Sequence, residues 1–179
     1  GGWHDAADMS QQALQTGEIA FSIMEMANRA KEKNDVDLYN RLMEESLWGI
    51  DFIMKTRLDD GNRFMTWGTN LWTDRLIGTI DDAGRRQVTV HNGGFENFLF
   101  SGIEAYASMS IDHDPMLKEN LKKIAKEDFG HAVKRFEEFG YDERINKGHG
   151  HAYMASQSQY MASVSWAASM LYKLTGEKY

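Results

Sequence analysis

Cysteine is absent from the 179 residues, which excludes disulfide bonds, a thiolate nucleophile and a zinc–thiolate site within them. Proline is nearly absent: Pro115 stands alone, whereas average usage of about 5% would give roughly nine prolines. Because helix interiors exclude proline, this scarcity favours a helical fold. Long apolar runs are missing too, since none approaches the roughly 18 to 20 residues that span a bilayer. A membrane partner is therefore not expected.

Basic side chains are in deficit, with 20 lysine and arginine residues against 27 aspartate and glutamate residues and a formal net charge of −7. Nucleic-acid binding requires a basic surface, so no nucleic-acid partner is predicted. The length suits one domain with a hydrophobic core. The chain begins at Gly1 without an initiator methionine or a signal-peptide pattern and ends at Tyr179. We therefore expect a domain that is truncated at both ends.

Apolar residues at three- and four-residue spacing predict five helices. The runs cover residues 13–31, about 38–57, 95–106, 117–136 and 160–171. Asn34-Asp35 separates the first two runs, and such a short polar connector is typical of an antiparallel αα-hairpin. Asp114-Pro115 suits a helix start, because aspartate caps the first turn and proline fits within it. We predict one all-α unit of successive αα-hairpins, as stacked in a toroid or a solenoid.

The helical pattern lapses between Asp59 and Gly94, where three turn-forming sequences occur. A short ribbon is predicted at residues 63–67 or 87–91. A connection of this length is usually functional or disordered, and its dispersed aromatic residues argue against disorder. A second polar loop, rich in glycine, covers residues 140–150. Long insertions thus fall on alternate connections.

Two carboxylates, Asp5 and Asp8, lie three residues apart just before the first predicted helix. In a tight loop or a first helical turn they would converge, and two convergent carboxylates can hold and deprotonate one water molecule, as an inverting hydrolase requires. The alternative is a helix start whose acids favour the helix dipole. Spacing alone leaves both interpretations open.

Three segments of the chain resemble glycoside hydrolase family 9, the inverting cellulases and related β-glucanases. Residues 1–8, Gly-Gly-Trp-His-Asp-Ala-Ala-Asp, are similar to the family's glycine-aromatic-Asp-Ala-Gly-Asp signature. Residues 48–55 resemble its tryptophan-glycine-x-aspartate-aromatic helix, and residues 160–179 resemble its Trp-Ala-Ala helix with a Thr-Gly exit. The segments occur in the family's order and span nearly the whole chain.

The resemblance implies a role for each aspartate: Asp8 would be the general base, and Asp5 would help to position the nucleophilic water. Two positions depart from the family pattern. Ala7 replaces a glycine, and residues 162–164, Ala-Ser-Val, stand where cellulases usually carry Asp-Glu-Leu. The second departure puts the usual substrate, or its usual placement, in question.

The implied fold is an (α/α)6 toroid of six αα-hairpins, with the active cleft built from the longer loops at one end. Five helices would form the N-terminal part of this catalytic domain. The family's general acid is a glutamate near the end of the domain, so it would lie outside this chain, and the chain alone would be inactive. The resemblance also implies a polysaccharide or oligosaccharide substrate, no cofactor, and a secreted or periplasmic full-length protein.

Aromatic residues outside the helices are candidates for sugar contact, because indole rings stack on pyranose rings. These residues are Trp3, Trp67 and Trp72. Each either lines a substrate cleft or packs onto the helices. In contrast, Trp48 and Trp166 lie within amphipathic runs and are expected in the core.

The histidines give weaker signals. His4 and His91 either contact substrate or are simply solvated. His149 and His151 alternate as in a metal-binding ribbon, but a third ligand is missing at useful spacing. No metal site is therefore predicted.

Two alternatives to a catalytic domain of this family stay open. One is a non-catalytic carbohydrate-binding α-toroid, which the departure at residues 162–164 favours. The other is a toroid hydrolase or lyase of another family that acts on a different glycan. In either case a partial toroid would expose apolar helix faces, so we expect the chain alone to self-associate.

Overall fold

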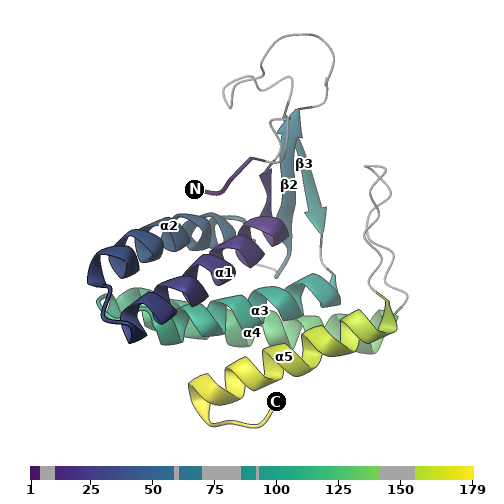
Figure 1. Ribbon diagram of the computed structural model, residues 1–179. Helices are drawn as coiled ribbons and strands as arrows, with labels where there is room; N and C mark the ends of the chain where they lie inside the picture. Colours follow the sequence, from purple (N-terminus) through teal and green to yellow (C-terminus); the bar gives the residue numbers. More distant parts are fainter. Residues whose placement is uncertain (5–10, 59–60, 70–85, 92, 142–155) are drawn as a thin grey trace.

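A computed structural model describes residues 1–4, 11–58, 61–69, 86–91, 93–141 and 156–179 (Figure 1). Three predicted site residues, Asp5, Asp8 and Trp72, lie outside the described residues, as do His149 and His151. The described part contains the helices α1 (Ala13–Glu32), α2 (Val36–Lys55), α3 (Gly94–Ser110), α4 (Pro115–Phe139) and α5 (Gln157–Thr175) and the strands β1 (Gln11–Gln12), β2 (Arg63–Thr69) and β3 (Arg86–His91). The mainly helical fold is confirmed, and both candidate ribbon segments form strands.

Side-chain caps explain where three of the helices begin. Asp35 accepts a hydrogen bond from the Leu38 amide at 3.1 Å, and Asp114 accepts one from the Leu117 amide at 2.9 Å. Ser156 forms a capping box with the side chain three residues later. These caps satisfy amide groups that would otherwise have no partner at a helix start. The predicted start at Asp114-Pro115 is confirmed.

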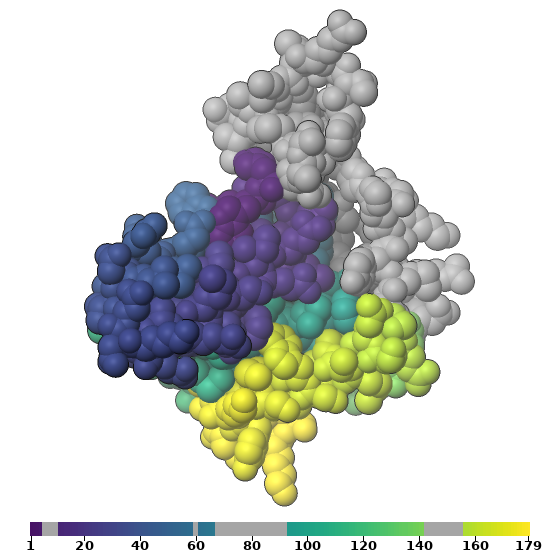
Figure 2. All heavy atoms as spheres, in the orientation of Figure 1, coloured from purple at the N-terminus to yellow at the C-terminus, as the bar shows by residue number. Residues whose placement is uncertain are grey.

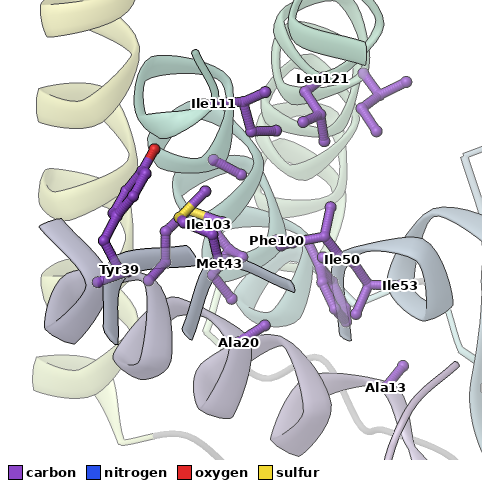
Figure 3. Close-up of a cluster of buried hydrophobic side chains, with 14 of the residues drawn as sticks. Ala13, Ala20, Tyr39, Met43, Ile50, Ile53, Phe100, Ile103, Ile111 and Leu121 are labelled. Carbon is purple, nitrogen blue, oxygen red and sulfur yellow. The ribbon is translucent and has the colours of Figure 1, made fainter. Parts of the chain in front are cut away.

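The main hydrophobic core lies between α1, α2 and α3 (Figure 3). Phe100 and Ile103 of α3 are buried against Ile50 and Ile53 of α2 and against small side chains of α1 such as Ala20. A second cluster, centred on Phe98, joins α3 to α4 and α5. α3 therefore lies at the centre of the bundle, and Figure 2 shows little of it between α1 and α5.

Three helices begin at the same end of the bundle. They are α1, α3 and α5, whereas the short connections 33–35 and 111–114 lie at the opposite end (Figure 1). The sheet also rises from this end, with antiparallel strands in the order β1-β2-β3. None of the described helices is long and apolar enough to cross a bilayer. The end that carries the sheet is therefore where the candidate functional residues must be sought.

Candidate functional site

The N-terminal residues lie against α2. The Trp48 indole Nε1 donates to the Gly2 carbonyl at 3.1 Å, and the Trp3 indole Nε1 donates to Glu45 Oε1 at 2.8 Å. The Trp3 ring is half-buried and packs on the main core. Three consecutive residues are thus placed by hydrogen bonds and packing to one helix.

Two glycines make this docking sterically feasible. A Cβ at Gly49 would lie 2.7 Å from the Trp3 ring, so any side chain there would displace the indole. Gly2 has a φ of +82° and faces the Phe52 ring, so it needs both the left-handed conformation and the missing side chain. Glycine at these two positions lets the backbone and the Trp3 ring approach α2 closely.

Two of the three segments that resemble the family therefore contact each other. Gly1, Gly2 and Trp3 belong to the first, and Trp48, Gly49 and Phe52 belong to the second. The contact ends at Trp3, two residues before Asp5. The contact with α2 thus fixes the position of Trp3, from which the chain continues to Asp5 and Asp8.

Backbone pairing places the other end of that segment. His4 and Gln11 form an antiparallel bridge, and Gln11 pairs in turn with Trp67 of β2. Neighbouring strands lie about 4.8 Å apart, so the backbones of His4 and Trp67 are separated by about two strand spacings. The structure thus brings together the backbones of two predicted sugar-contact residues, at the two ends of the segment that contains Asp5 and Asp8.

The other predicted contact residues are placed as follows. His91 ends β3 and pairs with Arg63 at the start of β2. It therefore lies four positions along the ribbon from Trp67. Trp3, in contrast, lies on the α2 side of the N-terminal segment.

The structure corrects the expectation for Trp48. Its side chain is not in the core but is 54% exposed on α2, where it holds the N-terminal segment by hydrogen bonding. The physical reason is its offset from the buried face of α2, which carries Met43, Ile50 and Ile53. Trp166 meets its expectation, because its half-buried ring packs edge-on against Phe21 at 5.3 Å.

The third family-like segment forms α5 and its end. Thr175 Oγ1 donates to the Leu171 carbonyl at 2.8 Å, and Gly176 ends the helix with a φ of 75°. At the departure from the family pattern, the Ser163 hydroxyl is buried and donates to the Tyr160 carbonyl at 2.7 Å. Residues 162–164 therefore supply helix packing and no carboxylate.

A buried ionic cluster, which the sequence did not predict, lies beside the base of the ribbon. We define the arginine–carboxylate cluster as Arg63, Glu104, Asp128 and Arg57. The Arg63 guanidinium binds both carboxylates and donates to the Ile53 carbonyl at 2.6 Å, and it lies 4.0 Å from the Phe100 ring centroid.

Arg57 extends the cluster to the surface. Its Nη2 donates to Asp128 at 2.8 Å and to Glu127 at 3.0 Å. Arg63, Glu104 and Asp128 are each at most 1% exposed. Removing one partner of a buried ion pair typically costs about 3–5 kcal/mol, because the other charge is left uncompensated.

Glu104 is the electrostatically unusual member. Burial of its carboxyl group and the nearby charge of Asp128 raise its pKa to about 8, against the opposing effect of Arg63 and Arg57. One sequence signal could have revealed it, since Glu104 is the single charged residue between Phe98 and Ser110. A lone acid within an apolar helix indicates a buried polar partner.

Metal binding finds no support in the part of the chain that the structure describes, where no three histidine, aspartate or glutamate side chains are placed to share an ion. The pair His149 and His151, for which the sequence predicts no metal site, lies outside the described residues.

Solved structures similar to this chain include an endoglucanase and a GH9 protein. The endoglucanase CelQ of Clostridium thermocellum matches as its cellotriose complex, with a TM-score of 0.68 at 17% identity, and as its cellotetraose complex, with a TM-score of 0.66 at 16% identity. A GH9 protein of Bacteroides ovatus gives a TM-score of 0.67 at 19% identity. The described helices thus share the fold of these proteins and form part of an (α/α)6 toroid.

Each alignment covers 98% of this chain, but it covers 28% of the two CelQ chains and 35% of the Bacteroides ovatus chain. This chain therefore spans about a third or less of their length. No curated protein sequence matches. The model of glycosyl hydrolase family 9 matches residues 1–179. This match includes all three of the family-like segments, and the chain belongs to glycosyl hydrolase family 9.

Proposed function

We propose that the chain is the N-terminal part of the catalytic domain of an inverting glycoside hydrolase that cleaves a β-linked glucan. Asp8 would act as the general base that takes a proton from water, and Asp5 would hold that water in line with the anomeric carbon. Family membership supports the reaction class. The cello-oligosaccharides in the two CelQ complexes support the substrate class.

One observation carries this proposal. The segment with Asp5 and Asp8 starts directly after a tryptophan that is docked on α2, and its flanking residues, His4 and Gln11, pair with each other. A general base must lie within hydrogen-bond reach of its water, so its backbone has to be held. The docking of Trp3 on α2 and the strand pairing of His4 and Gln11 support such a constraint.

Substrate contact is proposed for the aromatic and histidine residues near this segment. The backbones of His4 and Trp67 lie two strand spacings apart across Gln11. Aromatic faces with a few polar groups are how sugar sites are built. The residues proposed to line the site are Trp3, His4, Trp67, Trp72 and His91.

The general acid is proposed to lie outside these 179 residues. Inversion needs a second carboxyl group about 6.5 to 9.5 Å from the base. Resemblance to the family supports a glutamate beyond Tyr179 as this acid, so the chain alone is expected to release no sugar from a glucan. A secreted or periplasmic location of the full-length protein is proposed on the same resemblance.

The decisive variant is Asp8→Asn in the full-length protein. We expect hydrolysis of a soluble β-glucan to fall by about a thousandfold or more, because the water loses its base. Asp37→Asn is the matched control, since it removes an exposed aspartate from the first turn of α2 at the opposite end of the bundle. Wild-type turnover by Asp8→Asn would refute the assignment.

Two further measurements separate the alternatives. Proton NMR of the first product should show the inverted anomer, whereas a lyase would release an unsaturated sugar. The carbohydrate-binding alternative predicts that calorimetry detects cello-oligosaccharide binding to a full-length protein without turnover.

A further inference from the structure

Arg63 stands at the point where the ribbon leaves the helix bundle. Among the strand residues whose exposure the structure describes, it alone is buried, at 1% exposed. The next three residues of β2 are half-buried. Burying an arginine at the base of a ribbon is costly unless its charge is compensated. The groups that compensate the Arg63 charge therefore determine where this residue can lie.

The compensation comes from three helices. Glu104 is on α3, Asp128 is on α4, and the Ile53 carbonyl is near the end of α2. A guanidinium group has donors in a fixed planar arrangement, so three acceptors from three directions determine both its position and its orientation. The first residue of β2 is thereby fixed relative to α2, α3 and α4 at once.

From Arg63 the ribbon leads to the proposed catalytic segment. Trp67 lies four residues further along β2, which is about 13 Å of extended chain, and pairs with Gln11. Gln11 pairs with His4. A small tilt at Arg63 is therefore carried through rigid strand pairing to both ends of the segment that contains Asp5 and Asp8.

We propose that Arg63, held by Glu104 and Asp128, is a positioning residue that sets the ribbon, and through strand pairing His4 and Gln11, relative to the helix bundle. The catalytic consequence rests on the proposed function, whereas the placement of the ribbon does not. The competing explanation is that the cluster merely stabilises the bundle.

The double variant Arg63→Met/Glu104→Met separates these explanations in the full-length protein. It replaces the buried Arg63–Glu104 contact by apolar side chains of similar length, and replacing such buried polar pairs is often neutral for stability. Asp128 keeps its ion pair with Arg57. We expect the helices to stay folded at the assay temperature. We expect kcat on a soluble β-glucan to fall by about tenfold to a hundredfold, because small misplacements have effects of this size, with KM changed less than about threefold.

Two companion variants complete the test. Glu104→Gln keeps an acceptor oxygen for Arg63 and should retain kcat within about threefold. Leu121→Ala removes a fully buried side chain from α4 and thus lowers stability without touching the ribbon. Wild-type kcat in a folded double variant would overturn the proposal, and so would an equal loss of kcat in Leu121→Ala.

Amide hydrogen exchange tests the placement without any enzymatic assay. In the double variant the amides of β2 and β3 should exchange at least about tenfold faster than in the wild type, while those of α1 and α3 keep their protection. Unchanged exchange in the strands would overturn the proposal. If the wild type hydrolyses no glucan, the proposed function fails, and the exchange data alone decide the role of Arg63.

Discussion

At the scale of single residues, Glu104 shows how folding changes the chemistry of a side chain. Its carboxyl group moves from water to a site that is 0% exposed, where Arg63 binds one oxygen and the other oxygen, Oε2, has no partner among the described residues. Desolvation outweighs the nearby guanidinium charge, so its pKa rises from 4.5 to about 8.

This shift predicts a pH dependence of stability. Between about pH 4.5 and pH 8 the unfolded chain releases the Glu104 proton, whereas the folded chain retains it. Raising the pH therefore favours unfolding, and the stability contributed at low pH is lost as the pH approaches 8. The side chain in Glu104→Gln does not titrate, so this variant lacks that loss of stability. Its thermal midpoint should therefore rise relative to that of the wild type as the pH increases from 5 to 8.

The comparison needs a matched variant on the same bundle. Glu119→Gln removes an exposed glutamate from α4, and its midpoints should be measured by circular dichroism at the same pH values. Parallel pH profiles for wild type and Glu104→Gln would show that Glu104 is ionised alike in the folded and unfolded states.

At the scale of elements, the contact between the N-terminal residues and α2 depends on the helix surface. Glycine is usually unfavourable inside a helix by about 1 kcal/mol relative to alanine. α2 nevertheless carries Gly49, because the Trp3 ring occupies the space of its side chain. The local preference of the helix is overridden by a contact with a segment 46 residues away.

Gly49→Ala should consequently destabilise the protein. A Cβ would lie 2.7 Å from the Trp3 ring and 2.9 Å from Ala20 Cβ, and overpacking of this kind costs about 1–3 kcal/mol. The control is Gly130→Ala on α4, where nothing lies within 4 Å, so the same change should stabilise by up to about 1 kcal/mol. Urea unfolding of both variants measures the difference, and equal effects would refute the packing explanation.

At the scale of the whole molecule, the bundle exposes large apolar side chains on the helices at its flanks. On α1, α2 and α5 they are Ile19, Met26, Val36, Leu38, Trp48, Met161 and Tyr172. α3 lies between these helices and is mostly buried. Apolar faces of this kind favour association in water.

The 179-residue chain expressed alone should therefore self-associate. Its mass by light scattering after size-exclusion chromatography should rise with concentration, and Met26→Glu combined with Met161→Glu should reduce this rise. Met116→Glu is the control, because Met116 is 85% exposed but lies on α4. A monomer at every concentration, with a steep unfolding transition at high temperature, would contradict the expectation.

The sequence by itself determined the helices, because periodicity and capping at Asp114 act over a few residues. Its dispersed motifs also indicated family 9, which the family model confirms. The roles of Asp5 and Asp8 stay predictions, as they lie outside the described residues. For the ribbon, the local sequence pattern indicated residues 63–67 or 87–91 but not that these two segments pair, because strand pairing depends on long-range contacts.

Only the tertiary structure decided which distant residues meet. It placed Trp48 on the surface beneath the N-terminal segment rather than in the core. It also joined Arg63 to Glu104 and Asp128, which are 41 and 65 residues away along the chain. Such contacts depend on how several helices pack together, and no local periodicity records that packing. The placement of the ribbon beside the proposed catalytic segment follows from these long-range contacts.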